Sequence, residues 1–131
     1  MTKTAFLFAG QGAQYLGMGR DLYEHYPIVK ETIDQASQVL GYDLRDLIDK
    51  EETKLNQTRY TQPAILATSV SIYRLLKEKG YQPDMVAGLS LGEYSALVAS
   101  GALDFEDAVA LVAKRGAYME EAAPAGLSLI H

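Results

Sequence analysis

The chain of 131 residues contains no cysteine, and it has no long run of apolar or of basic residues. Without cysteine, the sequence excludes a disulfide scaffold, a thiolate nucleophile and any metal site with cysteine ligands. No basic run exceeds two residues and the net charge is −5, so we expect no nucleic-acid partner. The apolar run that follows Met1 is too short for a signal sequence or a membrane span. We therefore expect a soluble, cytoplasmic protein without a membrane partner.

Two short apolar runs, residues 5–9 and 85–87, predict buried strands, and each of them leads into glycine. Helical patterns follow both strands, whereas no repeat, linker or low-complexity stretch divides the chain. Short strands that alternate with helices are typical of parallel sheets. The sequence therefore predicts an α/β fold, rich in helix, with short parallel strands.

Apolar spacing predicts four helices, which cover residues 27–40, 62–79, 92–100 and 105–122. Pro63 suits the first turn of the second helix, and Gly41 and Gly80 suit positions just past a helix end. Asp104 is the predicted N-cap of the last helix. Residues 49–58 are charged and polar, and we interpret them as an exposed connection.

Residues 88–92, GLSLG, match the G-x-S-x-G pattern between a predicted strand and a predicted helix. Such an elbow holds the serine, here Ser90, in a sharp turn with its hydroxyl projecting from the sheet. The free N–H groups at the helix start, with Leu91 first, point to where negative charge develops on a substrate oxygen. Ser90 is thus a candidate nucleophile; the alternative is an ordinary helix-capping serine.

The loop after the first strand, residues 10–14, has the sequence GQGAQ. Loops at the ends of parallel strands converge on one crevice, and small residues such as Gly10 let the backbone approach a substrate. The backbone N–H of Gln11 is therefore a candidate second oxyanion donor. A phosphate-binding loop or a simple tight turn is the alternative, although the Lys-Ser/Thr pair of a P-loop is missing.

Arg115 falls on the predicted apolar stripe of the last helix, together with Ala108, Leu111, Val112 and Met119. A guanidinium that faces the core keeps its charge and needs an anion, and its planar fork matches a carboxylate. The alternatives are an ion pair with a buried acidic residue and a side chain that reaches solvent.

Two further polar residues, Gln62 and His25, bear on the site. Gln62, just before Pro63, is a candidate to turn its amide into the same crevice; the alternative is an ordinary residue at a helix start. His25 lies in a segment flanked by tyrosines without a partner for catalysis, so we interpret it as a packed or surface residue.

Four motifs occur together and in order: AFLFAGQGAQYLGMG at residues 5–19, TQPA at 61–64, GLSLGEYSAL at 88–97 and AKRGAYM at 113–119. With them the chain resembles the N-terminal part of bacterial malonyl-CoA:acyl carrier protein transacylases of type II fatty-acid synthesis, up to about residue 125. The resemblance implies that residues 1–131 are the N-terminal portion of an acyltransferase domain. It also implies an α/β-hydrolase-like core that is incomplete relative to the family, without its ferredoxin-like subdomain.

The resemblance implies a reaction in two steps without a cofactor or a metal. Ser90 attacks malonyl-CoA, the substrate, and the resulting malonyl ester passes to the phosphopantetheine thiol of acyl carrier protein. The backbone N–H groups of Gln11 and Leu91 hold the oxyanion, and Arg115 binds the free malonyl carboxylate. Gln62 lines the pocket near the acyl group, and Gly10 belongs to the substrate-binding loop.

The chain departs from the family pattern in two respects. Leu89 stands where the family commonly has histidine, and the family's activating histidine lies in a part that has no counterpart here. Neither His25 nor His131 sits in a matching motif. Because a serine without a base is a poor nucleophile, we expect the chain alone to be weak or inactive. We also expect it to self-associate through uncovered apolar surface.

Two other functions use the same residues. A serine esterase or thioesterase would employ the Ser90 elbow without a carboxylate site. A non-catalytic domain would bind carrier protein, with Lys114 as a contributor to the basic patch that an acidic carrier requires.

Overall fold

The computed structural model describes residues 3–122. Two strands, β1 (Ala5–Phe8) and β2 (Met85–Gly88), pair in parallel, with Ala5 opposite Met85 and Phe8 opposite Gly88. The helices of the described chain are α1 (Arg20–His25), α2 (Pro27–Leu40), α3 (Leu44–Lys50), α4 (Glu52–Leu55), α5 (Thr58–Glu78), α6 (Leu91–Ala99) and α7 (Phe105–Ala122). A parallel pair needs a long crossover, which α1 to α5 supply here. The predicted helix-rich α/β class with short parallel strands is confirmed.

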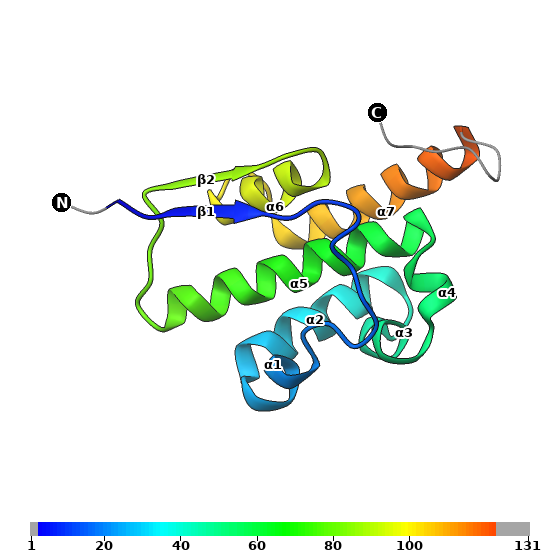
Figure 1. Ribbon diagram of the computed structural model, residues 1–131, viewed down its shortest axis with the longest axis horizontal. Helices are drawn as coiled ribbons and strands as arrows, with labels where there is room; N and C mark the ends of the chain where they lie inside the picture. Colours follow the sequence, from blue (N-terminus) through cyan, green and yellow to red (C-terminus); the bar gives the residue numbers. More distant parts are fainter. Residues whose placement is uncertain (1–2, 123–131) are drawn as a thin grey trace.

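The long helix α5 lies at the centre of the arrangement (Figure 1). The sheet runs along one side of α5, where Tyr73 packs edge-on against the rings of Phe6 and Phe8. Helix α6 contacts both strands, α7 packs along α5, and α2 covers another side of α5. The elbow between β2 and α6 and the loop after β1 therefore lie at the same end of the sheet.

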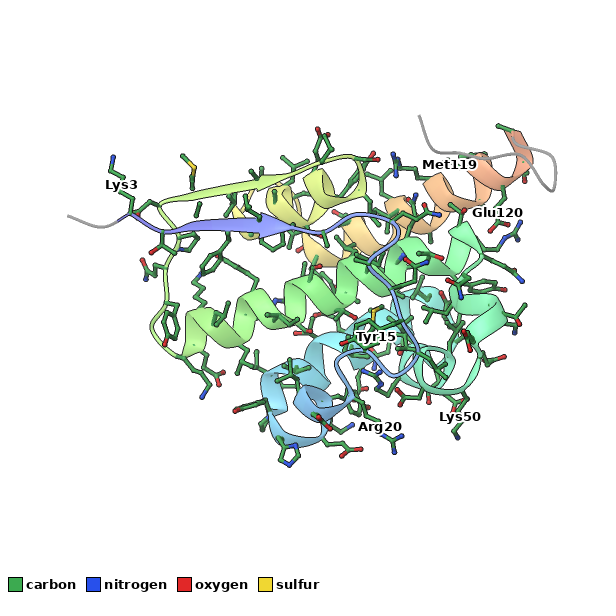
Figure 2. All side chains as sticks on the ribbon, in the orientation of Figure 1. Lys3, Tyr15, Arg20, Lys50, Met119 and Glu120 are labelled. Atoms are coloured by element: carbon green, nitrogen blue, oxygen red, sulfur yellow. The ribbon has the colours of Figure 1, made fainter. Side chains whose placement is uncertain are left out.

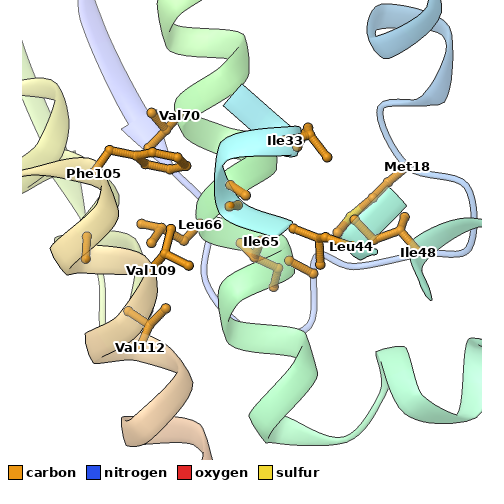
Figure 3. Packing of buried hydrophobic residues seen from close by; sticks show 14 of the residues in the cluster. Met18, Ile33, Leu44, Ile48, Ile65, Leu66, Val70, Phe105, Val109 and Val112 are labelled. Carbon is orange, nitrogen blue, oxygen red and sulfur yellow. The ribbon is translucent and has the colours of Figure 1, made fainter. Parts of the chain in front are cut away.

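The core is built around α5 and consists of aliphatic side chains from several helices. Leu66 and Val70 of α5 face Val109 and Phe105 of α7, whereas Leu44 of α3 packs on another side (Figure 3). Leu66, Val70, Val109 and Leu44 are completely buried. Burial of each large apolar side chain contributes about 1.5–3 kcal/mol, so this core fixes α5 and α7 relative to each other.

The first residue of α5 is Thr58, four residues earlier than predicted, and Pro63 therefore lies in the second turn. A contact from α7 satisfies one of the free N–H groups at this early start. The carboxylate of Glu120, whose side chain is labelled in Figure 2, accepts hydrogen bonds from the backbone N–H of Arg59 at 2.8 Å and from its Nε at 2.7 Å. Burial, the largest single effect, raises the pKa of Glu120, but these contacts with Arg59 outweigh it and hold the pKa below its ordinary value.

The prediction for residues 49–58 is confirmed for exposure, because most of these residues are exposed, but the prediction of a connection without helix is wrong. This segment contains the end of α3 and all of α4, and Leu55 is completely buried. Helix α1 was not predicted either; its N-cap, Gly19, has no side chain to cap it. The predicted ends hold, since Gly41 caps α2 with φ 81° and Gly80, with φ 94°, follows α5.

The strands are less buried than their apolar sequences suggested. Leu7 is 80% exposed and Met85 is 63% exposed, because no described segment covers that side of the sheet. The prediction of buried strands is therefore wrong for the described residues, and this apolar surface is the kind through which we expect self-association. No helix within residues 3–122 is both long and apolar enough to cross a membrane.

Candidate active site

Ser90 adopts a backbone conformation that side chains rarely tolerate. Its φ of 56° and ψ of −117° make it the one non-glycine residue with positive φ in the described part of the chain. Glycine normally occupies this combination of angles in tight turns, and a residue with a side chain adopts it at a cost of about 1–3 kcal/mol. The hydroxyl is exposed and forms no capping hydrogen bond with α6, so the helix-cap alternative is wrong. The turn instead presents the hydroxyl to the surface.

Glycines allow the elbow to contact β1 and the loop after it. A Cβ atom on Gly88 would overlap the carbonyl oxygen of Gly92, and one on Gly92 would overlap that of Phe8. A Cβ atom on Gly10 would lie 3.2 Å from the carbonyl oxygen of Leu89. The loop after β1 therefore packs directly against the Ser90 turn, as the convergence of strand ends predicted.

Two backbone N–H groups, one in the Ser90 turn and one in the loop that packs against it, have no partner in the described part of the chain. Neither the N–H of Leu91, at the first position of α6, nor the N–H of Gln11 has an acceptor among residues 3–122. The N-terminus of α6 adds a partial positive charge at the same place. The arrangement can hold an oxyanion that forms next to the Ser90 hydroxyl.

Arg115 on α7 is half-buried, and its guanidinium reaches Ser90. Nη2 lies 3.3 Å from Ser90 Oγ, Nη1 donates to Gln62 Oε1 at 3.0 Å, and the Tyr94 ring lies 5.5 Å away. No acidic side chain within residues 3–122 forms an ion pair with Arg115. The structural ion-pair alternative is therefore wrong for the described residues, and the guanidinium retains capacity for an anion.

The apolar stripe predicted for the last helix needs correction. Leu111 is 44% exposed, and the buried face of α7 is made by Phe105, Ala108, Val109, Val112 and Gly116. Arg115 lies at the edge of this face, next to Gly116. A position at the edge explains how the side chain reaches both the interior residue Gln62 and the exposed Ser90.

Gln62 is buried at the centre of the polar residues, with 1% of its surface exposed. Its Oε1 accepts from Arg115, and its Nε2 lies 3.4 Å from Gln11 Oε1 and 3.3 Å from Met119 Sδ. Because it lies in the second turn of α5, the alternative of an ordinary helix-start residue is wrong. Gln62 joins the anion-binding side chain to the loop after β1.

The described residues supply no base for Ser90. Arg115, which can only donate, is the one side chain within hydrogen-bonding distance of Ser90 Oγ in that part of the chain. His25 lies on α1, where its Nδ1 is 2.7 Å from the carbonyl oxygen of Asp21. His131 lies outside the described residues. No group of three or more acidic or histidine side chains within residues 3–122 is arranged to hold a metal ion.

Three contact residues were not predicted as members of the site: Tyr94, Met119 and Thr58, the last of which accepts from Gln11 Nε2 at 3.2 Å. Tyr94 follows Ser90 by one helical turn, and Thr58 precedes Gln62 by one turn. Both spacings place the residues on one helix face, a signal that the sequence contained. The spacing of Thr58 and Gln62 was not informative, because the helix was expected to begin at Gln62 and so to leave Thr58 outside it.

A family model described as the acyl transferase domain matches residues 5–129. The chain belongs to the acyl transferase domain family. Among curated relatives of this chain, the malonyl CoA-acyl carrier protein transacylase of Bacillus subtilis is 52% identical over 127 residues. The match covers 96% of this chain and 40% of that relative, so the chain spans about 40% of the length of such relatives. It corresponds to their N-terminal part, which confirms the resemblance.

Solved structures agree with this assignment. The chain superposes with a TM-score of 0.92 on MCAT from Streptococcus pneumoniae, to which it is 93% identical. The match covers 93% of this chain and 40% of that chain. A malonyl-transacylase solved in complex with its type II PKS acyl-carrier protein gives a TM-score of 0.90 at 50% identity, with 94% of this chain and 40% of that chain covered.

Proposed function

We propose that this chain carries the acyl-binding half of a malonyl transferase, which moves a malonyl group from malonyl-CoA to the phosphopantetheine thiol of acyl carrier protein. The observation that carries the proposal is the guanidinium of Arg115, 3.3 Å from Ser90 Oγ and without an acidic partner in residues 3–122. A malonyl thioester has a carboxylate one methylene from the carbonyl that Ser90 would attack. A nucleophile beside an anion site fits that substrate.

In the first step, Ser90 Oγ forms a bond with the thioester carbon of malonyl-CoA, and the carbon–sulfur bond then breaks. The proton of Ser90 leaves through a general base, and CoA departs as a thiol. The oxyanion that forms in between would be held by the backbone N–H groups of Gln11 and Leu91, at about 3–4 kcal/mol for each donor. In the second step the carrier thiol attacks the Ser90 ester and releases the serine hydroxyl.

Arg115 would select malonyl over acetyl groups. A malonyl carboxylate would pair with the guanidinium, whereas an acetyl group would leave the cation half-buried and without an anion. Gln62 fixes one edge of the guanidinium and Tyr94 flanks it, so the free edge is already oriented toward Ser90. This preorganisation supports the roles proposed for the three residues.

Acyl carrier protein is the proposed acceptor. Support comes from the malonyl-transacylase, 50% identical to this chain, that was solved with its acyl-carrier protein. Carriers of this class are acidic, and Lys114, which is exposed and precedes Arg115 in the chain, is a proposed source of positive charge for docking. Because both proposed substrates are intracellular, we propose that the protein acts in the cytoplasm.

A hybrid enzyme tests the proposal. This chain would replace the matching part of the Streptococcus pneumoniae protein, to which it is 93% identical, so that the remaining length of the relative is present. We expect the hybrid to transfer malonyl groups to holo-acyl carrier protein, and Ser90→Ala to abolish the transfer. The isolated chain should transfer at most a trace, because no base is present among its described residues.

The same hybrid discriminates the esterase alternative. A transferase with an anion site should prefer malonyl-CoA over acetyl-CoA, whereas an esterase built on the same elbow should hydrolyse neutral esters and show no such preference. A hybrid that folds but transfers no malonyl group would overturn the proposal, as would near-normal transfer by the Ser90→Ala hybrid.

A further inference from the structure

A chain of side-chain hydrogen bonds leads from the anion site into the loop after β1, and its direction is fixed. The guanidinium of Arg115 can only donate, so the amide oxygen of Gln62 must face it, at 3.0 Å. The Gln62 amide nitrogen then points the other way, toward Gln11 Oε1 at 3.4 Å and Met119 Sδ at 3.3 Å. The orientation of one amide therefore determines that of the next.

The chain ends at a hydroxyl. Because Gln11 Oε1 faces Gln62, its Nε2 faces Thr58 Oγ1, at 3.2 Å. Thr58 is only 7% exposed and is the first residue of α5. A second contact runs parallel to it, because Gln14 donates to Asn56 Oδ1 at 3.0 Å. The start of α5 and Asn56, the C-cap of α4, thus hold the loop after β1 by one side-chain contact each.

One backbone hydrogen bond, from the N–H of Ala13 to the carbonyl oxygen of Gly10 at 3.3 Å, closes the turn around Gln11, and the side-chain contacts add to it. Gln11 lies between two glycines, and Gly12 has φ 109°, a conformation open to glycine alone. Thr58 itself is firmly placed, since its carbonyl oxygen would lie only 2.7 Å from a Cβ atom on Gly116. The fixed partner in the Gln11–Thr58 contact is therefore Thr58.

We propose that Thr58 is a positioning residue for the oxyanion site: its hydroxyl holds the Gln11 side chain and so directs the Gln11 backbone N–H toward the reacting carbonyl. The inference rests on the proposed function, in which that N–H stabilises the oxyanion. Thr58 does not touch Arg115, whose guanidinium is held by Gln62 and Tyr94. Loss of the hydroxyl should therefore slow acyl transfer to Ser90 without weakening the binding of a carboxylate.

Thr58→Val, which keeps the shape and removes the hydroxyl, tests this in the hybrid enzyme, because the isolated chain shows no base for Ser90 among its described residues. Thr58→Ser restores the hydroxyl, and Thr53→Val makes the same change at an exposed position of α4. Three quantities are measured: the rate at which malonyl-CoA adds mass to Ser90, the Kd for malonate from NMR titration, and the order parameter of the Gln11 amide.

We expect Thr58→Val to slow malonylation about tenfold, less than the 10²–10³ for outright loss of an oxyanion donor. The malonate Kd should stay within about twofold, and the Gln11 order parameter should fall. Thr58→Ser and Thr53→Val should match the parent hybrid enzyme in all three. An unchanged rate or order parameter in Thr58→Val would overturn the inference, and so would a parallel loss of malonate affinity or equal slowing by Thr58→Ser.

Failure of the proposed function has a different signature. In that case the parent hybrid enzyme neither gains malonyl mass nor binds malonate, whatever residue occupies position 58. The order parameter of Gln11 still decides whether Thr58 holds the loop, since that readout needs no substrate. A fall in the Thr58→Val hybrid alone would support the positioning role, and no change would overturn it.

Discussion

Ser90 Oγ lies 3.3 Å from Arg115 Nη2, although 25 residues separate the two in the chain. The elbow between β2 and α6 supplies the hydroxyl, and α7, which packs against α5, supplies the guanidinium. A nucleophile and a cation at this distance suit a substrate with a carboxylate close to its reacting carbonyl. The consequences for specificity, stability and pH dependence can each be measured.

Replacement of Arg115 should remove the preference for malonyl groups. In the hybrid enzyme, Arg115→Ala should reduce kcat/KM for malonyl-CoA by at least about thirtyfold, since loss of one partner of a desolvated charge pair costs about 2–5 kcal/mol. The value for acetyl-CoA should not fall. Arg115→Lys should retain part of the preference because it keeps the charge but not the fork. Arg20→Ala, a surface arginine paired with Glu24, serves as the control; an intact preference in Arg115→Ala would contradict the assignment.

The strained turn at Ser90 should be visible in stability. Ser90→Gly and Ser90→Ala both remove the hydroxyl, but only glycine accepts φ 56° and ψ −117° without strain. After the entropy cost of glycine is subtracted, Ser90→Gly should be more stable than Ser90→Ala by about 1 kcal/mol. Urea unfolding followed by circular dichroism gives the difference. A less stable Ser90→Gly would mean that the turn is not strained as described.

Gly116→Ala should be destabilising, against helix propensity. An added Cβ atom would lie 2.7 Å from the carbonyl oxygen of Thr58 and 2.8 Å from Cα of Arg59, so α7 and α5 must separate. We expect a loss of about 1–3 kcal/mol in the free energy of unfolding, typical of an overpacked interface. Propensity alone predicts a gain of about 1 kcal/mol. The sign of the change in the free energy of unfolding, measured by thermal unfolding, therefore distinguishes the two expectations. A stabilised Gly116→Ala chain would refute the close approach of α7 to α5.

Glu120 should contribute stability that depends on pH. Its pKa is held below the ordinary value by Arg59, so the contribution is fully present above the unfolded pKa, about 4.3, and fades as pH falls through the lower folded pKa. Near neutral pH, Glu120→Gln should cost about 1 kcal/mol, as expected for loss of a helix-capping contact. The deficit should shrink below about pH 4. Glu121→Gln, which removes the same charge next door, should show neither effect; a deficit independent of pH would contradict the assignment.

The sequence predicted the elements whose signals are local. Both strands, the elbow at Ser90 and the ends of α2 and α5 follow from apolar runs and glycines within a few residues. The start of α5 depends instead on Glu120, 61 residues from Arg59, and no local pattern reveals that contact. Residues 49–58 are mostly polar, and a single completely buried side chain, Leu55, holds α4 to the core. One apolar residue forms no periodic pattern, so the sequence did not reveal this helix.

In the site, too, the residues with local sequence signals were predicted and the contacts between distant segments were not. Ser90 and Leu91 were assigned from a motif, and Arg115 from a charged residue among apolar ones. The contact of Gln62 with both Arg115 and Gln11 could not be predicted, because it depends on how α5 packs against α7 and the loop. The stripe that pointed to Arg115 was itself partly wrong, since Leu111 faces solvent.

The most direct measurement offers the hybrid enzyme an equimolar mixture of malonyl-CoA and acetyl-CoA, without carrier protein, and locates any acyl group by peptide mass spectrometry. We predict that the acyl group is malonyl, that it lies on the peptide containing Ser90, and that the Arg115→Ala hybrid loses the selectivity. Acetyl and malonyl groups taken up equally by the parent hybrid enzyme, or malonyl mass on another residue, would contradict the account.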